Sequence, residues 1–310
     1  MQERNLKSYA GIVLRGMGMG AADVVPGVSG GTIAFITGIY EELINSLANI
    51  NVAAIRLLFT DGIKAFWKHI NGSFFVALFF GIAISVFSLA KLLTYLLVHH
   101  PIVLWAFFFG LVLASAIIII KTVPKWNWQN GIALVIGAGI AAAVSLVQTT
   151  ADGTTLPYIF LSGCIAICAM ILPGISGAFI LVILGSYAVI IQGIKDVDLA
   201  VIAVFAVGCV VGLLAFSKLL KYLFAHFKSF VLALLTGFLF GSLVKIWPWK
   251  NDLLDQPLYT HSDKRVEYAT EHVLPAAYQG ESNVLLASIF AIAGLTIVLA
   301  LDYFGKKEKG

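Results

Sequence analysis

The chain carries the same short run of turn-forming and hydroxyl residues twice. Residues 26–31 are Pro-Gly-Val-Ser-Gly-Gly and residues 173–178 are Pro-Gly-Ile-Ser-Gly-Ala. Eight of fifteen positions are identical when 26–40 is aligned with 173–187 at a constant offset of 147. Proline removes a backbone donor and glycine permits a tight turn, so each run separates two helices. The first amides of the following helix, together with its dipole, then form a site for an anion.

These two runs define two candidate binding tips. The first tip is Pro26, Gly27, Val28, Ser29, Gly30, Gly31 and Thr32, and the second tip is Pro173, Gly174, Ile175, Ser176, Gly177 and Ala178. Ser29 and Ser176 occupy capping positions, and we expect free amides over 28–32 and 175–179. The sequence leaves one alternative open, that the small residues only let helices pack closely. Their repetition in both halves of an apolar chain favours a transport site.

Ionisable residues flank the first tip. Arg15 and Asp23 are eight residues apart and so share roughly one helical face, and Glu41 follows the tip. Arg15 is a candidate phosphate ligand, because a guanidinium matches phosphate oxygens in bidentate fashion. Asp23 and Glu41 are candidates for coupling to protons or sodium. A structural Arg15–Asp23 pair is the alternative. The second copy has Met170 and Ala188 in place of Asp23 and Glu41.

A third feature is also duplicated. Two sets of residues spaced i, i+4, i+8 share a helical face and could attract an anionic headgroup: Lys91, Tyr95, His99 and Lys218, Tyr222, His226. Ordinary anchoring at the membrane interface is the alternative, because lysine snorkels and tyrosine favours that depth.

Composition indicates the class of protein that must position these groups. Hydrophobic residues make up 60% of the 310 residues, charged residues only 12%, and the mean hydropathy is +0.97. Soluble domains are about 45–50% apolar. Apolar runs long enough to span a bilayer lie near 72–98, 101–120, 130–148, 197–220, 229–246 and 283–303. The three cysteines lie in apolar segments, and we expect no metal site and no disulfide.

The predicted fold is an all-α polytopic membrane protein with two inverted-topology repeats. Each repeat is a re-entrant helical hairpin followed by three transmembrane helices. The first repeat is 1–150, with its hairpin at about 8–47 and an interfacial helix at about 50–70. The second is 151–310, with its hairpin at about 158–191 and an external loop at 247–281. A single helix over 158–191 would be about 51 Å long, much more than a bilayer core of about 30 Å needs.

Charge placement supports the hairpins. With both tips re-entrant and the N-terminus in the cytoplasm, fourteen of the twenty Lys and Arg residues face the cytoplasm; with both tips crossing, ten do. We therefore expect a multi-pass membrane protein with both termini cytoplasmic. An odd number of crossings in each repeat inverts the second repeat relative to the first.

The segment 18–32, with Gly38-Ile39-Tyr40-Glu41, resembles the signature of the bacterial polyprenyl-phosphate transporters. The resemblance covers nearly the whole chain and includes the second Pro-Gly-Ile-Ser-Gly run. It implies a flippase of the bacterial inner membrane that returns undecaprenyl phosphate from the outer to the cytoplasmic leaflet for peptidoglycan and other envelope polymers. The implied partners are that lipid and the bilayer. We expect no nucleic acid and no cofactor beyond a coupling ion, and homo-oligomerisation stays open.

Physical chemistry agrees with such a substrate. Only the charged headgroup needs a polar path through hydrocarbon, because the isoprenoid tail can stay in lipid. The expected mechanism is alternating access, in which one repeat rocks against the other. Two rivals remain: a channel or carrier for a small anion, and an intramembrane serine protease using the Gly-x-Ser-Gly runs. The protease is disfavoured because His99 and His226 are predicted at helix ends, so we expect a transporter rather than an enzyme.

Overall fold

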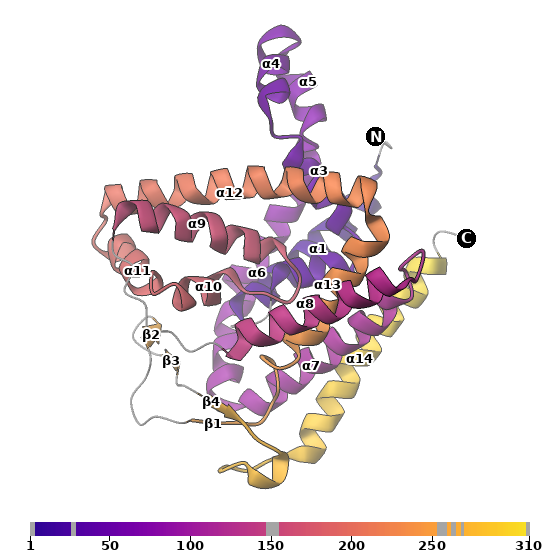
Figure 1. Ribbon diagram of the computed structural model, residues 1–310, viewed down its shortest axis with the longest axis vertical. Coiled ribbons are helices and arrows are strands. Elements are labelled where there is room, and N and C mark those ends of the chain that lie inside the picture. Colours follow the sequence, from indigo (N-terminus) through magenta and orange to yellow (C-terminus); the bar gives the residue numbers. More distant parts are fainter. Residues whose placement is uncertain are drawn as a thin grey trace.

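A computed structural model describes residues 4–25, 29–146, 155–252, 259–261, 265–267 and 270–307. Its first half contains α1 (Leu6–Val24), α2 (Gly30–Ile36), α3 (Tyr40–Ala48), α4 (Val52–Thr60), α5 (Gly62–His69), α6 (Gly72–His99), α7 (Pro101–Ile120) and α8 (Trp128–Leu146). Its second half contains α9 (Leu156–Ile171), α10 (Gly177–Ile183), α11 (Tyr187–Lys195), α12 (Leu199–His226), α13 (Lys228–Ser242), β1 (Lys250–Asp252), β2 (Tyr259–His261), β3 (Arg265–Glu267), β4 (Thr270–His272), a 3-10 turn (Pro275–Ala277) and α14 (Val284–Lys307). The molecule is a bundle of long helices from which α4 and α5 project (Figure 1).

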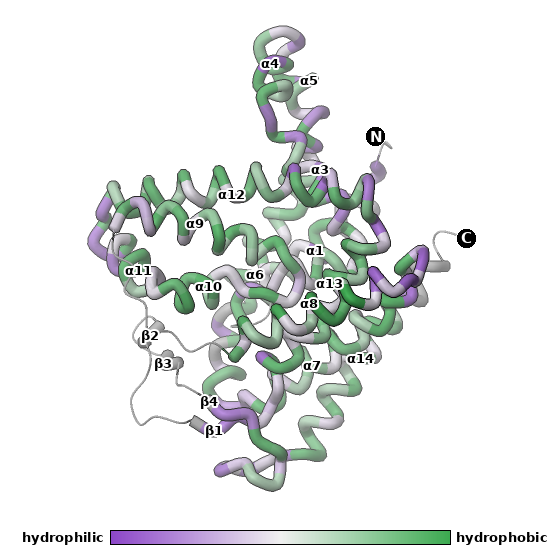
Figure 2. Tube along the Cα trace, in the orientation of Figure 1, coloured by the Kyte–Doolittle hydropathy of each residue, from purple (hydrophilic) through white to green (hydrophobic). Residues whose placement is uncertain are grey.

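The six apolar runs all form helices. They correspond to α6, α7, α8, α12, α13 and α14. Four of these are long and apolar enough to cross a membrane, and α13 and α14 contribute shorter apolar stretches. Large hydrophobic side chains such as Phe87 (85% exposed) and Val135 (67% exposed) face outward. Figure 2 shows hydrophobic residues along the helices of the body, with hydrophilic residues gathered at helix ends. The fold is therefore that of a helical, polytopic membrane protein.

Each expected hairpin contains one more break than the sequence analysis allowed. The hairpin expected over 158–191 has a break after its tip as well, because α10 and α11 are bent by 109° across Leu184–Ser186. Gly185 lies in the left-handed region with φ +66°, and its counterpart Gly38, between α2 and α3, has φ +73°. Glycine adopts this conformation without the steric cost of a side chain. Gly38 and Gly185 are 147 residues apart, so the two copies share this left-handed glycine as well as the tip.

The expected interfacial helix over 50–70 is also divided. It forms α4 and α5, which are separated at Asp61 and Gly62, where Gly62 has φ +80°. The pair leaves Phe59 and Ile63 exposed at 82% and 72%. The prediction of a single helix was wrong because one glycine in the left-handed conformation reverses the chain within an otherwise helical pattern.

The two halves use the same glycine-lined crossings. A Cβ on Gly16 of α1 would lie 2.2 Å from the carbonyl oxygen of Leu78 on α6, and one on Gly81 of α6 would lie 2.1 Å from that of Val13. In the second half, a Cβ added to Gly163 of α9 would lie 2.7 Å from the carbonyl oxygen of Phe205 on α12. One added to Gly208 of α12 would lie 2.3 Å from that of Phe160 on α9. Small residues permit this backbone approach, which favours helix association in membranes.

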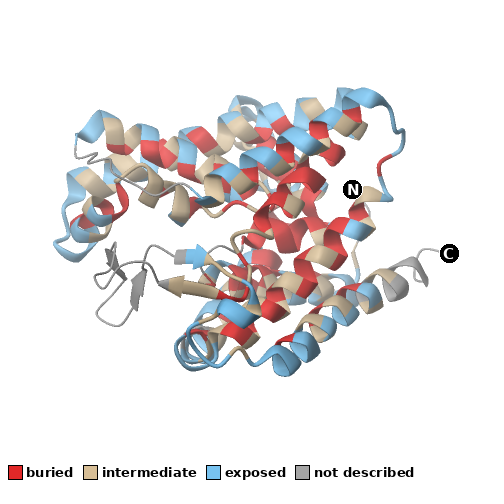
Figure 3. Ribbon diagram, turned by 60° about the horizontal axis from the view of Figure 1, so that its bottom comes forward, coloured by how far each residue is buried: buried red, intermediate tan, exposed pale blue. Residues whose placement is uncertain are grey.

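The remaining long helices pair across the halves. Gly110 of α7 packs on Ala291 of α14, and Gly237 of α13 packs on Leu134 of α8. The last helix of the first half, α8, packs on α13 of the second half. The last helix of the second half, α14, packs on α7 of the first half. Figure 3 shows buried residues concentrated in the centre of the molecule. We call α7, α8, α13 and α14 the exchanged block.

The polar segment 247–281 contains two short antiparallel strand pairs, β1 with β4 and β2 with β3. The indole of Trp247 donates to the carbonyl of Val273, and that of Trp249 donates to the carbonyl of Ser282. Trp247 also packs edge-on against Phe109 of α7. These contacts fix the β1–β4 pair to the end of the exchanged block, away from both chain ends (Figure 1).

Candidate functional site

The two tips meet each other. The amide of Gly174 donates to Oγ1 of Thr32 over 2.8 Å, and the hydroxyl of Ser29 donates to the carbonyl of Met170 over 3.1 Å. A Cβ on Gly31 would lie 2.5 Å from the carbonyl oxygen of Ile171. Residues more than 140 positions apart therefore form one junction, as the two tips of the sequence analysis require. Pro26, Gly27 and Val28 lie outside the described residues.

The first tip is capped by its own side chains. The carboxylate of Asp23 accepts from the amide of Gly30 over 2.7 Å, Oγ of Ser29 accepts from Gly31 over 3.1 Å, and the carbonyl of Ser29 accepts from Thr32 over 2.9 Å. The expectation of free amides is wrong for Gly30, Gly31 and Thr32 in this structure. An anion is indeed bound to this helix start, but it is the carboxylate of the preceding helix.

The second tip keeps its amides open. Ser176 makes no side-chain capping bond, and the amides of Gly177, Ala178 and Phe179 have no partner among the described hydrogen bonds. Pro173 and Ile175 are buried, while Ser176 is half-buried and Ala178 is exposed. A Cβ on Gly177 would lie 3.1 Å from Cβ of Met170, the residue that replaces Asp23 in this copy. The open helix start is therefore bordered by a thioether rather than a carboxylate.

A lysine that the sequence analysis did not select lies beside the second tip. Ser242 at the end of α13 packs on Gly174, whose added Cβ would lie 3.1 Å from the Cβ of Ser242. Three residues later, Nζ of Lys245 lies 3.7 Å from the ring centre of Phe179 in the first turn of α10. Lys245 thus places a positive charge against the side chain of Phe179, in the first turn of α10. No local pattern in the sequence links 245 to 179; only the fold brings them together.

Of the three ionisable candidates, one lies at the junction. Asp23 caps the first tip, whereas Arg15 is exposed on α1 and the described ion pairs do not join it to Asp23. Glu41 on α3 pairs with Lys228 at the start of α13 over 2.7 Å, with both side chains about half exposed.

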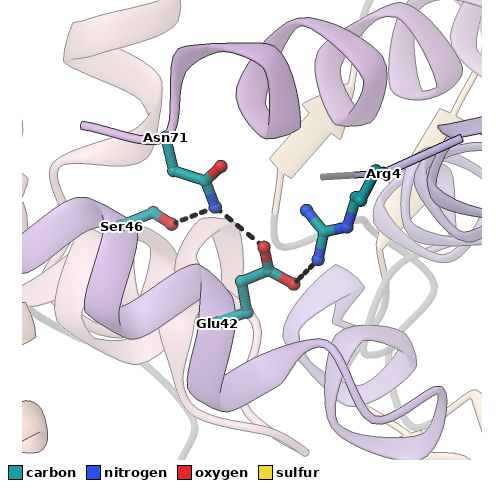
Figure 4. A network of polar contacts seen from close by, with 4 residues as sticks. All are labelled: Arg4, Glu42, Ser46 and Asn71. Carbon is teal, nitrogen blue, oxygen red and sulfur yellow. Dashed lines mark hydrogen bonds and ion pairs between the residues drawn. The ribbon is translucent and has the colours of Figure 1, made fainter. Parts of the chain in front are cut away.

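A polar network next to Glu41 fixes the other end of the first hairpin (Figure 4). Glu42 accepts from Arg4 and, over 2.7 Å, from Asn71, which also donates to Ser46 over 3.1 Å. The hydrogen bond to Glu42 raises the pKa of Arg4 above its ordinary value. The network joins the start of α1, the middle of α3 and the start of α6, so it has a positioning role.

The duplicated basic-aromatic sets are built alike and lie on the surface. Tyr95 stacks on His99 at 4.2 Å, and Tyr222 stacks on His226 at the same distance. Nδ1 of His99 lies 3.0 Å from the carbonyl oxygen of Tyr95, and Nδ1 of His226 lies 2.9 Å from that of Tyr222, both within hydrogen-bond distance. Lys91 and Lys218 are exposed, and none of the described contacts joins either set to the tips.

The described residues contain no group of three or more His, Cys, Asp or Glu that could hold a metal ion. Cys164, Cys168 and Cys209 are free thiols, and Cys164 and Cys168 donate to glycine carbonyls of α12. The cysteines therefore serve helix packing.

Comparison with known proteins identifies the family of the chain. Residues 19–262 match the family described as undecaprenyl phosphate translocase-like. A protein of Vibrio cholerae named polyprenyl-phosphate transporter is 40% identical over 304 residues, which cover 97% of this chain and 98% of that protein. A Staphylococcus aureus protein of the same name is 30% identical over 255 residues, covering 76% of this chain and 85% of that protein.

No solved structure matches the chain. The names of both relatives and of the family describe transport and not catalysis. With a match over most of its length and relatives of this identity, the chain belongs to the undecaprenyl phosphate translocase-like family.

Proposed function

We propose that this protein moves a polyprenyl phosphate, undecaprenyl phosphate in bacteria, from the outer to the cytoplasmic leaflet of the inner membrane. The observation that carries the proposal is an open helix start at Gly177–Phe179, beside the Lys245 ammonium and within an apolar bundle. Amides and a cation together suit a phosphate headgroup. The names of the two relatives support the same substrate. The returned carrier would serve peptidoglycan and other envelope polymers.

The tips would play unequal parts. The second tip binds the headgroup through its amides and Ser176, and the first tip supports it through the Thr32–Gly174 hydrogen bond. Arg15, exposed on α1, would guide the phosphate toward the junction. The exposed sets at Lys91 and Lys218 would attract headgroups at the two surfaces.

The architecture we propose is a pair of inverted repeats, 1–150 and 151–310, each with one re-entrant hairpin and three crossings. The repeated glycine crossings and the repeated bends at Gly38 and Gly185 support it. Irregular backbone at membrane depth is tolerated where it lines a cavity or is buried in protein, as both tips would be.

Alternating access remains the proposed mechanism, with different moving parts. The exchanged block joins the two halves through α7–α14 and α8–α13, so rocking whole repeats would break those glycine contacts. The hairpins pack mainly on α6 and α12, through α1 and α9, and the second tip also contacts the end of α13 at Ser242. We therefore propose that each hairpin moves with α6 or α12 against the exchanged block.

Asp23 is the proposed coupling group. Its carboxylate holds the amide of Gly30, and protonation would weaken that bond and release the first helix start. The released amides would then take part in binding the phosphate. Glu41 would act at the surface through its pair with Lys228.

A carrier for a small anion could use the same open tip, and leaflet-resolved transport separates the two. The protein is reconstituted in proteoliposomes that carry a polyprenyl phosphate in one leaflet, with inorganic phosphate as competitor. We expect lipid translocation that excess inorganic phosphate reduces only weakly. Uptake of inorganic phosphate without lipid translocation would favour the small-anion carrier.

A further inference from the structure

The first half contacts the second half at the end of α12. The ring of Tyr40 on α3 packs edge-on against Phe224 of α12, with the ring centres 6.0 Å apart. Nζ of Lys221, about one turn earlier on α12, donates to Oδ1 of Asn49, the residue that follows α3, over 2.8 Å. We call these interactions of α3 with Lys221 and Phe224 the α3–α12 contact.

The corresponding helix of the second copy, α11, contacts the opposite end of α12. A Cβ added to Gly193 of α11 would lie 2.7 Å from Cγ1 of Val201, in the first turn of α12. The 28 residues of α12 span about 42 Å, more than a bilayer core of about 30 Å. Among the described residues, α11 does not pack on α6 as α3 packs on α12. The hairpin of one copy therefore reaches the long helix of the other copy on one side of the molecule and not on the opposite side.

Polar bonds hold α3 to its own half beside this contact. Glu42 accepts from Arg4, which precedes α1, and from Asn71, which precedes α6 (Figure 4). Asn71 also donates to Ser46 of α3. These bonds link α3 to the paired helices α1 and α6. A movement of α1 and α6 against α9 and α12 would carry α3 along, so the α3–α12 contact would have to open.

Tyr40 has an unmet bonding requirement at the centre of the contact. The residue is 1% exposed, and its hydroxyl has no hydrogen-bond partner among the described residues. The rings of Phe35 and Phe224 enclose it, with centres 5.1 and 6.0 Å away. A buried hydroxyl without a partner costs free energy, because burial removes its bonds to water. The contact is therefore weakened at its centre, as suits a surface that both opens and closes.

We propose that the α3–α12 contact is a gate, and that this structure has the gate closed. Arg4 binds Glu42 beside it, so the gate lies on the side of the N-terminus, which is cytoplasmic in the expected orientation. In alternating access by inverted repeats, opening of α3 from α12 would accompany closure of α11 on α6. The role of the gate rests on the proposed function: it stays closed while the headgroup enters from the outer leaflet, and it opens to release the headgroup to the cytoplasmic leaflet.

The direct test measures the distance across the gate without any transport assay. The three native cysteines are changed to alanine, and spin labels are attached at Asn45→Cys on α3 and Ala225→Cys on α12, both exposed positions. Pulsed electron paramagnetic resonance in nanodiscs should show two distances, the shorter one matching this structure. A control pair within the exchanged block, Val135→Cys on α8 and Phe230→Cys on α13, should show one distance. A single distance across the gate overturns the proposal.

Removal of the Tyr40 hydroxyl should favour the closed gate. Tyr40→Phe keeps the packing on Phe224 and removes the unmet bond, so the ratio of short to long distances should rise at least about fivefold. Tyr187→Phe, the same change at the corresponding position of the second copy, is the matched control and should not raise this ratio. A fall of the ratio in Tyr40→Phe would show that the hydroxyl stabilises the closed gate, which contradicts the proposal.

A reversible link across the gate tests its role in transport. In the cysteine-free protein, a reducible bifunctional thiol reagent joins Asn49→Cys to Lys221→Cys. We expect the link to stop lipid translocation in proteoliposomes and a reductant to restore it. The control link joins Arg4→Cys to Glu42→Cys within the first half, and it should leave the rate of its own unlinked variant unchanged. Translocation that continues with the first link in place overturns the gate. If wild-type protein moved no lipid while the labels still showed two distances, the proposed function would fail and the gate would stand.

Discussion

The first and second tips share a motif but differ in how their helix starts are satisfied. At the first tip, Asp23 and Ser29 accept from the amides of Gly30 and Gly31, and Ser29, Gly30, Gly31 and Thr32 are buried. At the second tip, the amides that follow Ser176 are open and lie near Lys245. The shared residues form the turn. The residues that differ determine whether the first amides of the following helix are hydrogen-bonded to side chains or left available to a ligand.

Three substitutions account for that difference. Asp23, Gly31 and Thr32 in the first copy correspond to Met170, Ala178 and Phe179 in the second. The first copy thereby gains a carboxylate cap, close backbone contact with Ile171 and a hydroxyl that accepts from Gly174. We propose that the first tip supports the site and the second tip binds the headgroup, and four predictions test this division.

The largest effect is expected from closing the space between the tips. Gly31→Val would place side-chain atoms against the carbonyl of Ile171, which is backbone and cannot move aside. We expect a loss of about 2–3 kcal/mol of stability by overpacking, with loss of transport, measured by thermal unfolding in detergent and by lipid translocation. The matched Ala178→Val lies at an exposed position and should change stability little. Equal effects of the two would abolish the distinction between support and receptor.

Substitution of Asp23 should have the second-largest effect. Asp23→Ala removes a charge-assisted cap and should cost about 1–2 kcal/mol, while Asp23→Asn keeps an accepting oxygen and should cost less. If Asp23 couples transport to protons, Asp23→Asn should flatten the pH profile of translocation while the protein stays folded. An unchanged pH profile would leave Asp23 with capping alone.

The two serines provide an internal comparison. Ser29→Ala loses a buried cap and the bond to Met170, so we expect a stability loss of about 1 kcal/mol. Ser176→Ala removes no capping bond, so stability should change by less than about 0.5 kcal/mol while lipid translocation slows. Chemical denaturation and transport assays on both variants decide this. A loss of stability in Ser176→Ala would show that Ser176 also caps the helix that follows it.

The smallest change is expected at the surface pair of the first half. Glu41→Gln breaks a half-exposed ion pair with Lys228, and such pairs contribute about 0.5 kcal/mol or less. Its counterpart is Ala188, which carries no charge that could form such a pair. A large loss of gradient-driven transport without a change in melting temperature would instead assign Glu41 to coupling.

The sequence predicted elements better than contacts. Long apolar runs revealed the six main helices, and Pro-Gly located both tips, because both signals are local. Glycine bends inside short apolar stretches, at Gly38, Gly62 and Gly185, were missed, since glycine is also frequent in straight membrane helices. The capping by Asp23 and the position of Lys245 depend on how separated segments pack, which one sequence does not encode in any local pattern.

The exchanged block bears on whether either half could pack alone. Each half packs its last helix against the other half, with Gly110 of α7 on Ala291 of α14 and Gly237 of α13 on Leu134 of α8. A half expressed by itself would leave these glycine surfaces exposed to lipid, so the two halves depend on each other for helix packing.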